Sequence, residues 1–248
     1  MSTERPGIFD GREKRFTSIL LAPLLLIAGA ALPAAADDSA DRASVPLECQ
    51  VRSALAEARG DGLKATAWAV SLAMLDPHSS YAASRVAGLY ETQGQDSAAL
   101  VWGEQALALD SLNSDAAMLV GRMRFLAGEP RLAARVLTPP LRQPGAMPEL
   151  YAFRALAHEV DRNYAAALAD LKRTGPLLPD FDWIATGILG MALEDGRLKE
   201  AHSAFQLAME LTPNDARTLS LGVSLAQRLG NPSLERALLR ALHALELP

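Results

Sequence analysis

The sequence predicts an all-α fold, a solenoid of about six helical hairpins. Half of its 248 residues are hydrophobic but only 5% are aromatic, and alanine and leucine carry most of the apolar content. Both are strong helix formers, whereas strands favour β-branched and aromatic residues. A spacing of 34 residues recurs through most of the chain. A fixed period of this length is typical of stacked helical repeats.

The first 36 residues have the order of a secretory signal peptide. Basic residues in segment 12–15 precede the uncharged stretch 16–32, and alanines 34–36 follow. We expect cleavage after Ala36 and export to a periplasm. The alternative is an uncleaved leader that anchors the chain in the inner membrane. However, the apolar stretch is shorter than the roughly 20 residues that a spanning helix needs, and Pro23 interrupts it.

Residues 37–45 are small and polar, and they are expected to form a flexible linker. The repeat region is then expected over residues 46–248.

Composition and motifs exclude several classes of function. The net charge is −5 with no basic block, so nucleic-acid binding is not expected. Cys49 is the only cysteine, which excludes an internal disulfide or a cysteine-based metal site. It is interpreted as an inert thiol, with a reactive thiol as the alternative. The sequence has no HExxH, G-x-S-x-G, P-loop or dinucleotide fingerprint, so we expect no enzyme, cofactor or metal.

Three columns of residues keep the 34-residue period without a gap. The first column marks a register in each unit: Gly60, Gly94, Gly128, Arg162, Gly196 and Gly230. Glycine suits the turn after a helix because the backbone there often adopts a positive φ. Five residues after the mark come Ala65, Ala99, Ala133, Ala167, Ala201 and Glu235, and this small residue predicts a close approach of two helices. Seventeen after the mark, proline recurs at residues 77, 179 and 213 and ends the second helix.

This pattern resembles the tetratricopeptide repeat family, whose unit is two antiparallel helices in 34 residues. The fifth unit carries the resemblance best, with Gly196, Ala201, Phe205, Ala208 and Pro213 at family positions. The resemblance implies a right-handed superhelical α-solenoid with repeats at 46–79, 80–113, 114–147, 148–181, 182–215 and 216–248. The sequence departs from the pattern at Pro139-Pro140, which we expect to break the second helix of the third repeat, and at Glu235 in the last repeat.

The resemblance also implies that the first helix of each repeat lines a concave groove. Residues 13, 10, 6 and 3 before each mark would then point inward. From these columns we select eight candidate partner-binding residues: Tyr81, Glu91, Met118, Arg122, Phe125, Glu159, Trp183 and Arg217. Aromatic anchors and acidic residues there predict a protein or peptide segment with apolar anchors and some positive charge. The alternative for each aromatic residue is a packing role. The family subtype that clamps a C-terminal carboxylate is not expected, because no asparagine occupies its groove position.

The expected function is therefore an exported scaffold or adaptor in a cell-envelope assembly or secretion process. A chaperone-like carrier of one client is an alternative. An envelope enzyme subunit and a scaffold tethered by an uncleaved leader are further alternatives.

Overall fold

The computed structural model describes residues 39–174, 181 and 183–246. The predicted signal peptide lies outside these residues. In the described part the chain forms twelve α-helices, one 3-10 turn and no strand, which confirms the all-α prediction. The helices are α2 (Ser39–Ala58), α3 (Gly62–Leu75), α4 (Ser80–Thr92), α5 (Asp96–Leu109), α6 (Ser114–Leu126), α7 (Pro130–Leu137), α8 (Pro148–Val160), α9 (Tyr164–Thr174), α10 (Trp183–Glu194), α11 (Leu198–Leu211), α12 (Ala216–Arg228) and α13 (Pro232–Glu246).

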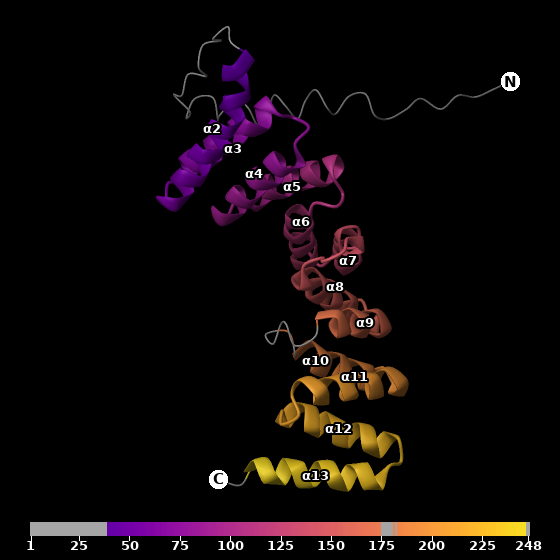
Figure 1. Cartoon of the computed structure of the whole chain (residues 1–248). Helices are drawn as coiled ribbons and strands as arrows, with labels where there is room; N and C mark the ends of the chain where they lie inside the picture. The colour runs from indigo at the N-terminus through magenta and orange to yellow at the C-terminus, as the bar shows by residue number, and fades with distance from the viewer. Residues whose placement is uncertain (1–38, 175–180, 182, 247–248) are drawn as a thin grey trace, which may run out of the picture.

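The helices pair in order as antiparallel hairpins, and each hairpin packs on the next. Figure 1 shows the result, an elongated and curved stack that runs from α2 and α3 at one end to α13 at the other. The first helices α6, α8 and α10 lie along one side of the stack, and their partners α7, α9 and α11 lie along the other. The chain is thus an α-solenoid, in which each hairpin buries its apolar faces against its neighbours.

The register marks are the turns between the two helices of each hairpin. All six residues have a positive φ, which lies between 58° at Arg162 and 77° at Gly128. At Gly94 the glycine N–H donates to the carbonyl of Glu91 and the Gln95 N–H donates to that of Tyr90, both at 2.9 Å. This pair of bonds is the Schellman motif, which satisfies the last carbonyls of a helix. The glycine column is therefore explained by backbone conformation.

The alanine column lies fully buried in the hairpins. Ala65, Ala99, Ala133, Ala167 and Ala201 are each 0% exposed. A larger side chain in such a position would force the helices apart. In the last hairpin Glu235 replaces alanine and is partly exposed.

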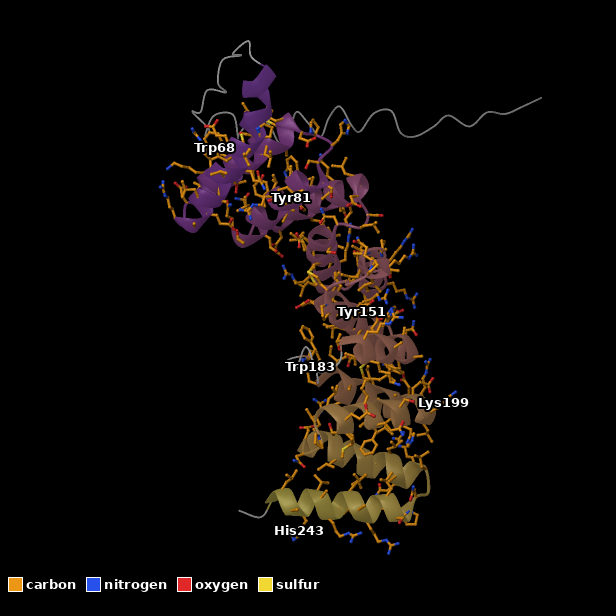
Figure 2. All side chains as sticks on the ribbon, viewed as in Figure 1. Trp68, Tyr81, Tyr151, Trp183, Lys199 and His243 are labelled. Atoms are coloured by element: carbon orange, nitrogen blue, oxygen red, sulfur yellow. The ribbon has the colours of Figure 1, made fainter. Side chains whose placement is uncertain are left out.

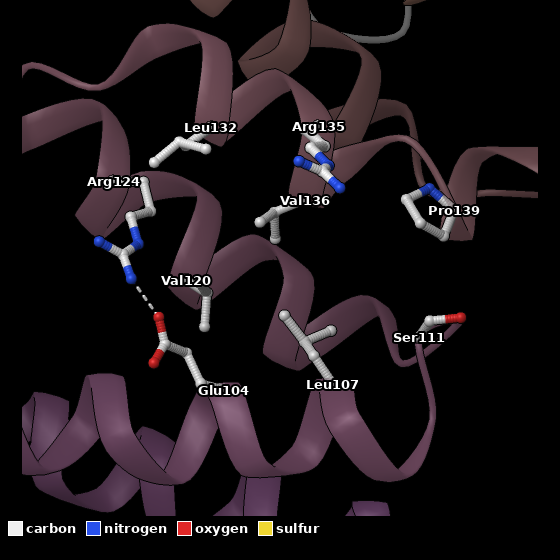
Figure 3. Close-up of a pocket in the computed structure, with 9 residues that line it drawn as sticks. All are labelled: Glu104, Leu107, Ser111, Val120, Arg124, Leu132, Arg135, Val136 and Pro139. Carbon is white, nitrogen blue, oxygen red and sulfur yellow. Dashed lines mark hydrogen bonds and ion pairs between the residues drawn. The ribbon is translucent and has the colours of Figure 1, made fainter. Parts of the chain in front are cut away.

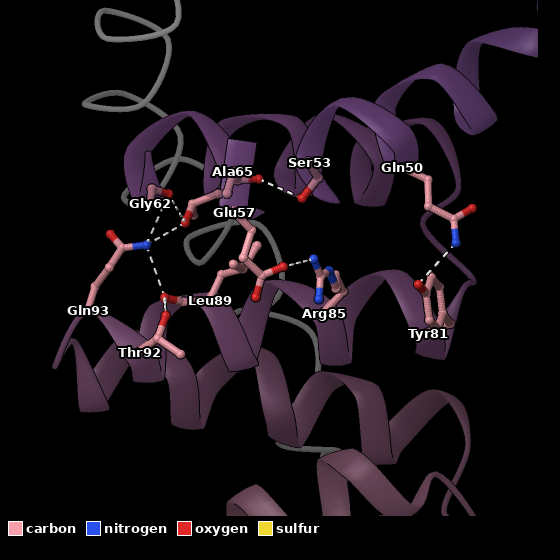
Figure 4. A network of polar contacts seen from close by, with 11 residues as sticks. Gln50, Ser53, Glu57, Gly62, Ala65, Tyr81, Arg85, Leu89, Thr92 and Gln93 are labelled. Carbon is pink, nitrogen blue, oxygen red and sulfur yellow. Dashed lines mark hydrogen bonds and ion pairs between the residues drawn. The ribbon is translucent and has the colours of Figure 1, made fainter. Parts of the chain in front are cut away.

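Polar contacts also join the first two hairpins (Figure 4). The Gln93 side-chain amide donates to the Gly62 carbonyl at 3.2 Å and to Thr66 Oγ1 at 2.6 Å. The start of α3 is thereby tied to the end of α4.

The third hairpin is irregular, as the sequence predicts. Its second helix α7 has only eight residues, and a 3-10 turn at Pro140–Arg142 follows it. Pro139 and Pro140 lack the backbone N–H that would continue the helix. The buried apolar residues form two main clusters, one over α2–α6 and one over α8–α13, with only small clusters between them.

The prediction of a flexible linker over 37–45 is wrong from Ser39 onward, because α2 begins there. The segment contains Ala40, Arg42 and Ala43, which are favourable in helices. Its polarity indicated exposure, which a helix end tolerates as well as a linker does.

Candidate functional site

The residues 13, 10, 6 and 3 positions before each register mark form one surface, which we call the first-helix face. Its outermost column is exposed in every hairpin. This column consists of Leu47, Tyr81, Asp115, Glu149, Trp183 and Arg217. Every first helix therefore presents an exposed side chain at this position.

Tyr81 and Trp183 are the two aromatic residues in that column, and each is about half exposed, at 51% and 52%. Gln50 Nε2 donates to Tyr81 Oη at 3.0 Å, so the ring is oriented from the preceding hairpin. Figure 2 shows Trp183 on the side of the first helices and Lys199 on the opposite side of the stack. Both aromatic side chains are available for contact from outside.

Met118 and Phe125, by contrast, are held by packing. Met118 lies against the cluster of Leu137 and Leu150, and Phe125 lies against Ala133 and Ala157. Both are only partly exposed. We therefore do not retain them as anchors, and the alternative interpretation of Phe125 as a packing residue fits its position.

Two acidic residues of the face are joined to arginines of the next hairpin. Glu57 on α2 accepts from Arg85 on α4, as Figure 4 shows, and Glu91 on α4 accepts from Arg122 on α6. All four side chains are partly exposed, so each pair is expected to contribute only about 0–1 kcal/mol. The expectation that Glu91 and Arg122 are free to meet a ligand needs correction, because they meet each other.

Glu159 differs from both. The sequence predicts it on an open groove, but its side chain is only 5% exposed. Its Oε2 is buried and has no hydrogen-bond partner among the described residues. A Cβ at Gly187 on α10 would collide with its Oε1, so the carboxyl group occupies space that the glycine leaves free. Burial raises the pKa of Glu159 to about 7, and the charge of Arg217 opposes that rise.

Sequence reasoning missed the role of Gly187 and Gly190. In the sequence, the two glycines do not follow a strand, as a dinucleotide-binding turn requires, and Gly190 suggested no more than a roomy groove; the structure places both inside α10. Comparison by register would have revealed their meaning. Gly187 lies nine positions before its mark, as Arg85 does, and Gly190 lies six before it, as Arg122 does.

A largely buried ion pair joins the helices of the fourth hairpin. Arg154 on α8 donates from Nε and Nη2 to the two oxygens of Asp170 on α9, both at 2.7 Å. Arg154 also donates to Thr138 Oγ1 at 3.1 Å, which links the pair to the third hairpin. This bidentate geometry is the strong form of a charged hydrogen bond.

A separate pocket with a volume of about 350 Å³ lies between α5, α6 and the short helix α7 (Figure 3). Leu107, Val120 and Leu132 are among its apolar lining residues, and an ion pair between Arg124 and Glu104 lies at its edge. It is not part of the first-helix face.

Other chemistry has little support in the described residues. Burial raises the pKa of the Cys49 thiol, which keeps it protonated and poorly nucleophilic at neutral pH. Within the part of the chain that the structure describes, no group of histidine, cysteine and acidic side chains is arranged to hold a metal ion. None of the helices described is long and apolar enough to span a bilayer.

Comparison with solved structures identifies the architecture. YrrB, described as a TPR protein with an unusual peptide-binding site, matches with a TM-score of 0.55 at 19% identity, over 72% of this chain and 98% of its own. The chain has the tetratricopeptide-repeat fold. MamA matches with a TM-score of 0.57 at 17% identity, over 71% of this chain and 96% of its own. Pseudomonas aeruginosa pilF matches at 0.51 and 19% identity, over 83% and 93%. No protein-family model and no curated protein matches the sequence.

Proposed function

We propose that the protein is an exported scaffold whose first-helix face forms a concave groove for a segment of another protein. The observation that carries this proposal is the exposed outermost column of the face, with Tyr81 and Trp183 half exposed in it. Tyrosine and tryptophan are enriched among the residues that dominate the binding energy of interfaces. The tetratricopeptide-repeat fold supports a role in protein–protein interaction, and YrrB has a peptide-binding site on that fold.

The cellular context of the proposal comes from the leader. The order of basic, apolar and small residues in 1–36 supports export. An assembly or secretion process in the cell envelope is then the setting in which such a scaffold would act. Sequencing the N-terminus of the protein recovered from the envelope tests export. A chain that begins at Asp37 supports a cleaved leader, and one that retains Met1 supports the membrane-anchored alternative.

The groove is tested by affinity capture of the tagged, exported chain from envelope extracts, with partners identified by mass spectrometry. The test variant is Tyr81→Ala with Trp183→Ala, which removes the two exposed rings and leaves the packed Phe125 in place. The matched control is Leu63→Ala with Lys199→Ala, which truncates two exposed side chains on second helices. Partners lost from the test variant and kept by the control support the groove. Partners kept by both variants contradict it.

The same experiment separates the scaffold from a chaperone-like carrier. A scaffold retains a small set of envelope proteins together. A carrier retains one dominant client, and its groove remains folded without that client.

A further inference from the structure

The first helices follow a pairing rule between neighbouring hairpins. The residue three positions before one register mark faces the residues that lie nine and six positions before the next register mark along the chain. Glu57 meets Arg85 at the first of these positions, and Glu91 meets Arg122 at the second. Where the residue three before the mark is Leu193, it packs in one apolar cluster with Leu221, which lies nine before the next mark. Acid therefore faces base, and apolar faces apolar.

Glu159 breaks this rule. It lies three before its mark, but the facing positions hold Gly187 and Gly190. The space at Gly187 is occupied by the Glu159 carboxyl group itself, and a Cβ at Gly190 would meet only Leu221, at an ordinary 3.6 Å. The positive charge of Arg217 on α12 favours the ionised form of Glu159, yet the buried Oε2 accepts no hydrogen bond from Arg217 or from any other described residue. The carboxyl group is thus left without the arginine that its counterparts have.

The surroundings of Glu159 suit a cation from outside. Trp183 lies one turn before Gly187 on the same side of α10, and its ring is half exposed. A guanidinium group can stack on an indole ring and donate two parallel hydrogen bonds to a carboxylate. Gly187 leaves room for the carboxyl group, and Gly190, one turn further along α10, carries no side chain on this side of the helix.

We propose that Glu159, Gly187, Gly190 and Trp183 form a socket for an arginine side chain of the bound segment, which takes the place that Arg85 and Arg122 occupy in the earlier hairpins. This inference rests on the proposed groove and names one residue of its ligand. Because Oε2 is covered in the free protein, binding requires the Glu159 carboxyl group to turn outward to the face. Pairing with the guanidinium then relieves the cost of a buried acid without a partner.

The socket is tested by nuclear magnetic resonance on the full chain with two small probes, N-acetyl-arginine amide and N-acetyl-citrulline amide. Citrulline has nearly the shape of arginine and no charge. We expect the arginine probe to shift the amide signals of Gly187 and Gly190 and the indole signal of Trp183 in a saturable way. The citrulline probe should bind at least about tenfold more weakly, as expected for loss of a charge-assisted pair.

Three variants locate the effect. Glu159→Gln should weaken binding of the arginine probe at least about tenfold, and Gly190→Arg should abolish it by supplying the missing arginine from within the chain. Glu91→Gln is the matched control, since that acid is already paired, and it should change nothing. Circular dichroism establishes that each variant is folded.

Equal binding of both probes, or unchanged binding of the arginine probe by folded Glu159→Gln, would overturn the socket. Partners captured through Tyr81 and Trp183 without any response to the arginine probe would leave the groove standing and refute the socket alone. A response to the arginine probe with no partner captured would support the socket and count against the scaffold.

Discussion

The first-helix face is built differently in its two halves. Over α2–α6 each acidic residue three before the mark is paired with an arginine one hairpin later, and the pairs are partly exposed. Over α8–α12 the equivalent Glu159 is buried against Gly187 and its Oε2 has no partner among the described residues. The same residue type at the same register position is therefore structural in one half and unsatisfied in the other. The facing residue 28 to 31 positions further along the chain decides between these roles.

The largest expected effect is the loss of unfolding free energy when the largely buried ion pair is broken, compared with the loss for a partly exposed pair. Asp170→Ala leaves Arg154 buried without its counter-charge and should lower the free energy of unfolding by about 3–5 kcal/mol. Glu91→Ala breaks the partly exposed pair with Arg122 and should cost less than about 1 kcal/mol. Urea denaturation of both variants measures the difference. Equal losses would show that the two halves do not differ in this way.

The next effect concerns pH. Because the pKa of Glu159 is raised from 4.5 to about 7, the folded protein keeps a proton there that the unfolded chain has lost. Stability should therefore fall as pH rises from about 4.5 to about 7 and stay at the lower level above that. Glu159→Gln lacks this loss and should be more stable than the parent at pH 8 by about 1–3 kcal/mol.

Denaturation midpoints of the parent and Glu159→Gln across this pH range test that expectation. Glu91→Gln serves as the control from the other half of the face. A parent whose stability does not fall between pH 5 and 7 relative to Glu159→Gln would contradict the unpaired carboxyl group.

The smallest effects come from two glycines of the second hairpin. Gly94 has a φ of 70°, so Gly94→Ala should cost about 1 kcal/mol, because an L-residue is strained in that conformation. Gly88 lies inside α4, and a Cβ there would meet nothing within 4 Å. Gly88→Ala should therefore raise stability by about 0.5–1 kcal/mol. Thermal melting of both variants shows whether each change raises or lowers the melting temperature. A change in the same direction for both would contradict the distinction between the turn glycine Gly94 and the helical glycine Gly88.

Much of the fold could be predicted from the sequence, because the residues that repeat every 34 positions have a strict backbone or packing role. Gly94 and Ala99 had to be small for local reasons, and Pro139-Pro140 had to break α7. The helical start of α2 was missed, since polarity does not separate an exposed helix end from a linker. The face was harder to predict. Tyr81 and Trp183 are exposed as expected, whereas the states of Glu91 and Glu159 depend on residues in the next hairpin.

The unpaired state of Glu159 is the central claim, and its carboxyl group can be followed directly. The measurement is a nuclear magnetic resonance pH titration of the Glu159 side-chain carboxyl carbon in the parent and in Gly190→Arg. We expect a midpoint near the pKa of about 7 in the parent and a clearly lower midpoint in the variant, where an arginine pairs with the acid as in the earlier hairpins. The same midpoint in both proteins, at the ordinary glutamate pKa of 4.5, would show that Glu159 is neither buried nor in need of a partner.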